Sequence, residues 1–209
     1  MTSSTGDHLE TEQKYDADAD FALPKLGALP GLAGRRPAAP RRIFLSATYY
    51  DTEDLDLLKH KVTLRRRIGG DDEGWHLKLP VRKDTRQEVH APLDEGASGS
   101  VPARLAAQVE DITASGRLHP VAILDTERTV VTLPGPPGDA LVEVADDRVT
   151  AIRFGESENK PMTWREIEVE ALSQDSRAAA LLTTVGRALR EAGARPSASG
   201  SKLARVLQS

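Results

Sequence analysis

The chain contains no cysteine, which excludes disulfide bonds and thiol chemistry and fits a reducing compartment. It also lacks any stretch near the roughly 18 apolar residues of a membrane span. The polar N-terminus has no apolar signal-peptide centre. We therefore expect a cytoplasmic protein with no membrane partner.

Several motifs that would indicate other chemistry are missing. There is no Walker or Rossmann glycine motif, no metal-ligand spacing among the five histidines and no serine nucleophile elbow. The net charge of −4, from 28 basic and 32 acidic residues, disfavours binding to nucleic acid through overall positive charge. The length of 209 residues suits one substantial domain. We expect a single domain over residues 1–209, with a flexible lead-in at 1–7 and an irregular, proline- and glycine-rich connection at 27–40.

What the chain does contain is a repeated alternation of charged and mostly apolar residues. Side chains alternate between the two faces of a strand, so charges two residues apart share one face. The first such stretch, residues 8–15, places Glu10, Glu12 and Lys14 on one face. Four later stretches repeat the pattern, with Arg65 and Arg67 in 63–68, His76 and Lys78 in 74–81, Glu143 between two valines, and Glu166, Glu168 and Glu170 in 164–172.

Two sheet arrangements satisfy this pattern. In one, the sheet closes with its apolar faces outside, under helices, and its charged faces around a central passage. In the other, an ordinary antiparallel sheet exposes a solvated face with cross-strand glutamate and arginine pairs. Composition alone does not separate them.

Other segments complete the expected elements. Residues 86–93 and 122–133 read as strands that carry Glu88 and Arg128. Turn residues predict one hairpin at 69–74 and another about Asp146-Asp147-Arg148, between strands at 141–149 and 150–155. Apolar residues at helical spacing predict amphipathic helices at 101–115 and 176–192, and a last short helix contains Lys202.

The charged residues of these strands can face one interior. The acidic ones are Glu10, Glu12, Glu88, Glu143, Glu168 and Glu170, and the basic ones are Lys14, Arg65, Arg67, Lys78, Arg128 and Lys202. Carboxylates suit Mg²⁺ or Mn²⁺, whereas arginine and lysine match phosphate oxygens. Both kinds together point to a metal-bound phosphate chain. For His76, Arg66 and Glu166 a solvated or structural role is the better interpretation.

These residues also resemble a known family. Glu10-x-Glu12-x-Lys14 is similar to the ExExK signature of the CYTH superfamily, the triphosphate tunnel metalloenzymes. Later blocks resemble the same family in the same order, namely Tyr49-Tyr50-Asp51-Thr52, Leu64-Arg65-Arg66-Arg67, Trp75-His76-Leu77-Lys78, Glu166-Ile167-Glu168-Val169-Glu170 and Ser201-Lys202-Leu203. The resemblance implies an α+β fold, in which a closed eight-stranded antiparallel β tunnel with a charged interior is flanked by helices.

The resemblance also implies roles for individual residues. A divalent metal, Mg²⁺ or Mn²⁺, would be held by Glu10, Glu12, Glu168 and Glu170, with Glu143 and Glu88 as further ligands. Phosphates would be bound by Lys14, Arg65, Arg67, Lys78, Arg128 and Lys202. Tyr49 or Lys14 would place or activate the attacking water. Members of this family often carry a helical CHAD domain after the CYTH domain, and residues 1–209 contain none.

The implied activity is metal-dependent hydrolysis of a triphosphate, with inorganic tripolyphosphate as the first substrate to test. The alternatives are a thiamine or nucleoside triphosphatase, a cyclase that makes cyclic AMP from ATP, and a polyphosphate-binding module without turnover. In each case the partner is a small phosphate-containing molecule and not a nucleic acid. The oligomeric state is left open.

Overall fold

The structure is a computed structural model that describes residues 8–32, 34–82, 85–96, 99–114, 116–135, 139–155 and 160–208. The side chains of residues 8–10, 82 and 85 lie outside the described part. The predicted lead-in at residues 1–7 lies outside it as well.

The strands make up most of the fold. They are β1 (His8–Ala17), β2 (Arg41–Asp51), β3 (Thr63–Ile68), β4 (Gly74–Arg82), β5 (Thr85–Ala91), β6 (His119–Pro134), β7 (Ala140–Arg153), β8 (Met162–Ala171) and β9 (Arg195–Pro196). Within the described residues they form one antiparallel sheet of nine strands, in the order β5-β4-β3-β2-β6-β7-β8-β1-β9.

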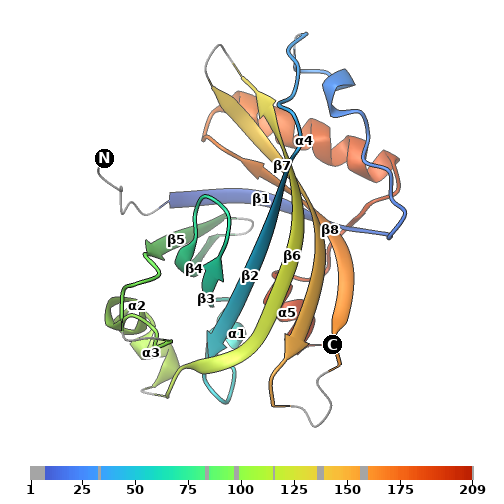
Figure 1. The fold of residues 1–209 in the computed structure, drawn as a ribbon. Helices are drawn as coiled ribbons and strands as arrows, with labels where there is room; N and C mark the ends of the chain where they lie inside the picture. Colours follow the sequence, from blue (N-terminus) through green and yellow to red (C-terminus); the bar gives the residue numbers. More distant parts are fainter. Residues whose placement is uncertain are drawn as a thin grey trace.

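The sheet curls strongly, and the long strands β2, β6, β7 and β8 bend together along one side (Figure 1). Strand β1 pairs with β8 and also with β5, from His8 opposite Glu88 to Thr11 opposite Thr85. The predicted α+β class and antiparallel sheet are confirmed. Closure of eight strands into a tunnel stays a prediction.

The hairpin predicted about Asp146-Asp147-Arg148 is wrong. Strand β7 runs without a break through these residues and pairs with β6 on one side and β8 on the other. Asp146 points outward and accepts two hydrogen bonds from Arg165, at 2.8 and 2.7 Å. Asp147 points inward and accepts two from Arg128, at 2.7 Å each. Arginines on neighbouring strands therefore satisfy two aspartates that the sequence alone makes typical of a turn.

The helices are short, apart from one. They are η1 (Leu26–Ala28), α1 (Asp56–Lys59), α2 (Ala103–Ala107), α3 (Glu110–Thr113), α4 (Ser176–Glu191) and α5 (Lys202–Leu207). The helix predicted at 101–115 is instead two short helices, because Val109 between them has a non-helical φ of −121°. In the described part of the chain, no helix is long and apolar enough to cross a membrane.

Helix α4 covers the outer face of β1, β7 and β8 (Figure 1). It begins at Asp175, whose carboxylate accepts the backbone N–H of Arg177 at 2.8 Å. The apolar residues of the predicted helix are buried against the sheet as expected: Leu181, Leu182, Val185 and Leu189. Because α4 covers the apolar face, the charged residues of these strands point to the concave side.

Helix α4 lies close against the sheet at Gly186. A Cβ atom there would lie 2.2 Å from Oη of Tyr15 and 2.6 Å from Oε1 of Gln13, which hydrogen-bond to each other. We predict that Gly186→Val lowers the free energy of unfolding by about 1–3 kcal/mol, the usual cost of overpacking. Thermal or urea unfolding measures this, with Arg187→Ala on the exposed face of α4 as the control. A Gly186→Val protein as stable as the control would contradict this packing.

Candidate functional site

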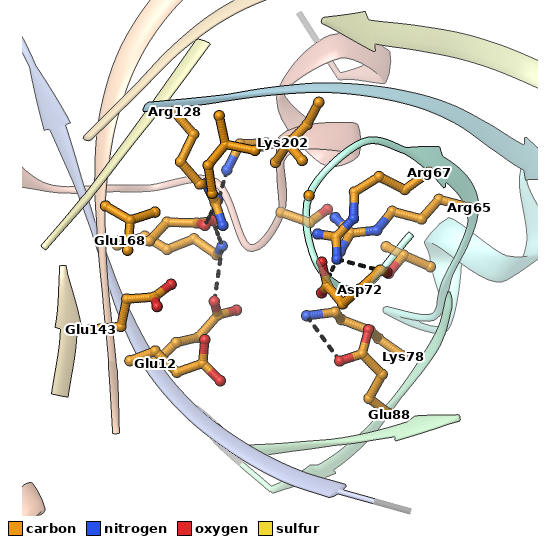
Figure 2. A pocket seen from close by; sticks show the side chains of 18 of the residues that line it. Glu12, Arg65, Arg67, Asp72, Lys78, Glu88, Arg128, Glu143, Glu168 and Lys202 are labelled. Atoms are coloured by element: carbon orange, nitrogen blue, oxygen red, sulfur yellow. Dashed lines mark hydrogen bonds and ion pairs between the residues drawn. The ribbon is translucent and has the colours of Figure 1, made fainter. Parts of the chain in front are cut away.

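The concave side of the sheet encloses a cavity of about 230 Å³ whose lining is mostly charged. Its basic side chains are Lys14, Arg41, Arg65, Arg67, Lys78, Arg86, Arg128 and Lys202. Its acidic side chains are Glu12, Asp71, Asp72, Glu88, Glu143, Glu168 and Glu170. The side chains labelled in Figure 2 lie in two groups that face each other, one around Glu168 and the other around Arg67. The near balance of eight cations and seven anions limits the cost of enclosing so much charge.

Glu168 of β8 is the centre of the first group. Its carboxylate accepts hydrogen bonds from Lys14, from Lys202 at 2.7 Å and from Arg128 at 2.5 Å. Burial raises the pKa of Glu168, but these three cations outweigh that effect and hold the pKa well below its usual range. Glu168 is therefore ionised at neutral pH, and it fixes one cation from each of three separate chain segments.

Lys202 enters the cavity from α5, which begins where Ser201 accepts the backbone N–H of Ala204 at 3.0 Å. The Lys202 ammonium lies 2.9 Å from Asp147, 2.7 Å from Glu166 and 2.7 Å from Glu168. Oxygen atoms of these three carboxylates lie within 4.8 Å of one another, close enough to hold a metal ion. The Lys202 ammonium already lies among these three carboxylates, so a metal at this place would have to displace it.

Glu166 and Asp147 are fully enclosed members of this group. Glu166 is 3% exposed, and its carboxylate accepts the indole N–H of Trp164 at 2.6 Å. Asp147 is 0% exposed, and burial alone would raise its pKa, but Lys202 and Arg128 lower it below its usual range. Both carboxylates hold cations in place. For Glu166, of the two roles expected from the sequence, this fits the structural one and not the solvated one.

A row of three glutamates lies beside this group. Glu170 on β8 is directly opposite Glu12 on β1 and Glu143 on β7. Side chains so placed have Cβ atoms about 4.5–5.5 Å apart, and like charges at that spacing destabilise a sheet. Glu143 makes no hydrogen bond or ion pair within the described residues, and burial raises its pKa. We call Glu12, Glu143 and Glu170 the carboxylate row. Glu12 also pairs with the Lys14 ammonium at 3.3 Å. The oxygen ligands of the row and its adjacent like charges fit a hard divalent cation.

Arg65 and Arg67 project from β3 into the opposite side of the cavity, whereas Arg66 does not line it. Arg65 donates to Oη of Tyr49 at 3.4 Å. Burial raises the pKa of Tyr49, but the charge and hydrogen bond of Arg65, with the charges of Lys202 and Lys78, together outweigh burial, so the net shift of the pKa is downward. The Nε atoms of both arginines are buried without a hydrogen-bond partner in the described structure. This side therefore has donors and positive charge available for an anion.

His76 joins two parts of this second group. Its Nδ1 lies 2.7 Å from Glu88 and its Nε2 lies 2.9 Å from the backbone oxygen of Asp72. Burial and the charges of Arg65 and Arg67 lower the pKa of His76 to about 2, so the ring is neutral at pH 7. A neutral imidazole has one N–H, so His76 donates in only one of the two contacts. Glu88 also lies 3.8 Å from the Lys78 ammonium.

Nearly all the residues proposed from the sequence line this one cavity. They are Glu12, Lys14, Tyr49, Arg65, Arg67, Lys78, Glu88, Arg128, Glu143, Glu168, Glu170 and Lys202. The side chain of Glu10 lies outside the described residues. The individual roles stay predictions. Glu168 is already bound by three cations, and Glu88 belongs to the group opposite the carboxylate row.

Sequence reasoning missed Arg41, Arg86, Asp72 and Asp147. Three signals were available: Asp147 is four residues after Glu143, Arg86 is two residues before Glu88, and Arg41 is eight residues before Tyr49, so each shares a strand face with its partner. The place of Asp72 had no such signal, because a turn position decides it.

The chain was compared with known proteins by sequence and by structure. The chain is 40% identical over 210 residues to uncharacterized proteins of two Mycobacterium tuberculosis strains, CDC 1551 and H37Rv. The match covers 96% of this chain and 40% of each relative, so the chain spans about two fifths of their length.

Solved structures share the fold at low sequence identity. A candidate adenylate cyclase from Bacillus halodurans aligns with a TM-score of 0.60 at 18% identity, covering 96% of this chain and 98% of that one. A candidate adenylyl cyclase from Hippeastrum, described as having a dominant triphosphatase activity, aligns with a TM-score of 0.57 at 18% identity, covering 95% of each chain. The family model of the CYTH domain matches residues 8–205. This chain therefore belongs to the CYTH domain family.

Proposed function

We propose that the protein is a metal-dependent triphosphatase that hydrolyses inorganic tripolyphosphate within its charged cavity. The observation that carries the proposal is the arrangement of donors: Arg65 and Arg67 face the cluster of Lys14, Arg128 and Lys202 across the cavity. A short chain of phosphates is the kind of ligand that reaches cations on both sides at once.

The pairing of β1 with both β8 and β5 supports the further proposal that eight strands surround this ligand as a tunnel. A surrounding sheet brings cations to a polyanion from all directions and excludes part of its water. Both effects strengthen charge–charge interactions.

The polar lining favours the inorganic substrate. Tyr49 is the one aromatic residue that lines the cavity within the described residues, and the apolar lining is limited to Ile43, Leu45 and Val130. A nucleobase or thiazole ring is usually held by apolar and aromatic side chains. The names of the structural neighbours nevertheless keep a nucleotide cyclase as the second candidate.

The cavity residues have distinct tasks in this proposal. Arginine and lysine side chains bind the phosphates and offset the charge that develops during in-line attack. Lys14 stays protonated, because Glu12 and Glu168 outweigh its burial and raise its pKa, so it orients water or phosphate and does not act as a base. Tyr49 is held by Arg65 near the same space and can orient the attacking water. A divalent cation at the carboxylate row would supply Lewis-acid polarisation of a phosphate oxygen.

A substrate panel tests the proposal. We expect phosphate release from tripolyphosphate, with a higher kcat/KM than for thiamine triphosphate or ATP, and loss of activity with EDTA. Formation of cyclic AMP from ATP would identify a cyclase instead. A rise in melting temperature with tripolyphosphate but no turnover would identify a binding module, because a ligand of the native state stabilises it without being converted.

The alternation along β3 gives a second test. We predict that Arg65→Ala and Arg67→Ala each lower kcat/KM for tripolyphosphate about 10- to 150-fold, which corresponds to about 1.5–3 kcal/mol for a charged hydrogen bond. Arg66→Ala should change it less than about three-fold, because Arg66 points away from the cavity. Steady-state kinetics with circular dichroism on all three variants measures this. If Arg66→Ala is as damaging as its neighbours, the assignment of faces is wrong.

The carboxylate row predicts opposite effects on stability and on metal binding. We predict that Glu143→Gln raises the Mn²⁺ dissociation constant at least about ten-fold, because a charged oxygen ligand is lost. The same substitution should leave the melting temperature in EDTA unchanged or higher, because it removes a like charge directly opposite Glu170. Mn²⁺ titration by electron paramagnetic resonance and thermal unfolding measure the two effects. Glu127→Gln, exposed on β6, is the control and should alter neither.

A further inference from the structure

The turn between β3 and β4 forms part of the cavity wall. This acidic turn, residues 69–73, carries Asp71, Asp72 and Glu73 in succession. Its path requires glycine at the start, because Gly69 has a φ of +87° and a Cβ there would lie 2.3 Å from the backbone oxygen of Phe44. The chain therefore turns back along the cavity, and Asp71 and Asp72 line it. Two of the seven acidic side chains in the cavity thus come from one turn.

Asp72 contacts Arg67 through two groups. Its carboxylate forms an ion pair with the Arg67 guanidinium, and its backbone oxygen accepts a hydrogen bond from Nη2 of Arg67 at 3.3 Å. The two side chains differ sharply in exposure, at 5% for Arg67 and 64% for Asp72. Water can therefore solvate the Asp72 carboxylate if the ion pair opens, whereas Arg67 stays enclosed and needs another anion. Nε of Arg67 has no partner in the described structure even with Asp72 in place.

A phosphate that binds Arg67 needs the same guanidinium that Asp72 contacts. We infer that Asp72 is a specificity-determining residue, a carboxylate of the protein's own that competes with the ligand for Arg67. This inference rests on the proposed triphosphate site. An anion with several linked charges can displace the Asp72 carboxylate from Arg67 while its other charges stay bound to Lys14, Arg128 and Lys202. A single small anion that displaces Asp72 makes fewer contacts, so it gains less binding free energy.

The competition has a measurable cost in affinity. Apparent affinity falls in proportion to the fraction of molecules in which the binding group is available. If Arg67 is available in about one molecule in five to ten, removing the competing charge tightens binding about five- to ten-fold. Asp72→Asn keeps the backbone contacts and the side-chain size but removes the negative charge. Because the Asp72 side chain is largely exposed, Asp72→Asn is not expected to disturb folding.

Binding of tripolyphosphate in EDTA, measured by isothermal titration calorimetry, tests the inference without turnover. We expect Asp72→Asn to lower the Kd about five- to ten-fold relative to wild type. Asp71→Asn is the matched control, since it removes the same charge from the same turn. Asp71 pairs at 2.5 Å with Arg41, and both side chains are more than half exposed, so its removal should change Kd less than about two-fold. Equal tightening by both variants would mean a general charge effect and would overturn the inference.

A double-mutant cycle isolates the Arg67 contact. In an Arg67→Ala background, Asp72→Asn should no longer tighten binding, because the group for which Asp72 competes is gone. Tightening that persists there would overturn the inference. If wild type binds tripolyphosphate and Asp72→Asn binds equally or more weakly, the inference is wrong and the proposed function stands. If neither binds, the triphosphate site is wrong and the inference fails with it.

Discussion

Mutual neutralisation of enclosed charges is the constraint on which the concave side of this sheet depends. Removing an ion from water costs several kcal/mol unless an opposite charge and hydrogen bonds replace the water. Glu168 meets this condition with three cations, and Lys202 meets it with three carboxylates. Because Lys202 comes from α5, one of the cations that pair with the carboxylates of β7 and β8 is in place only when the C-terminal segment packs against the sheet.

The charges of the cavity divide into two classes by how completely they are paired. Asp147, Glu166, Glu168 and Lys202 pair with one another and with Lys14 and Arg128, and they hold each other in place. In the carboxylate row like charges lie side by side, and Arg65 and Arg67 have buried Nε atoms without partners in the described structure. The first class fixes positions while its cations still line the cavity. In the proposed function a metal at the carboxylate row and a polyphosphate at the arginines would complete the second class.

The outer side of the sheet explains how so many charges can point inward. Apolar residues alternate with the charged ones, and α4, α5 and the short helices α2 and α3 cover them. Trp164 connects the two sides, since its ring lies under the Arg205 guanidinium at 5.3 Å while its N–H binds Glu166. Trp164 therefore links Arg205, on the outer side of α5, to Glu166, which pairs with Lys202 in the cavity.

Alternation within each strand was readable from the sequence, because the period of two is a local property of extended backbone. It predicted which residues share a face and most residues of the cavity, while apolar residues at helical spacing predicted the long amphipathic helix. The tertiary structure decided those features of the site that depend on pairing between segments distant in the sequence. The sequence Asp146-Asp147 is typical of a turn. In the folded chain these residues lie within a strand, because Arg165 and Arg128 on the neighbouring strands bind their carboxylates. The placement of Asp72 on Arg67 and of Lys202 among three carboxylates likewise depends on strand register and on the path of a turn, because only the folded chain brings these partners within bonding distance.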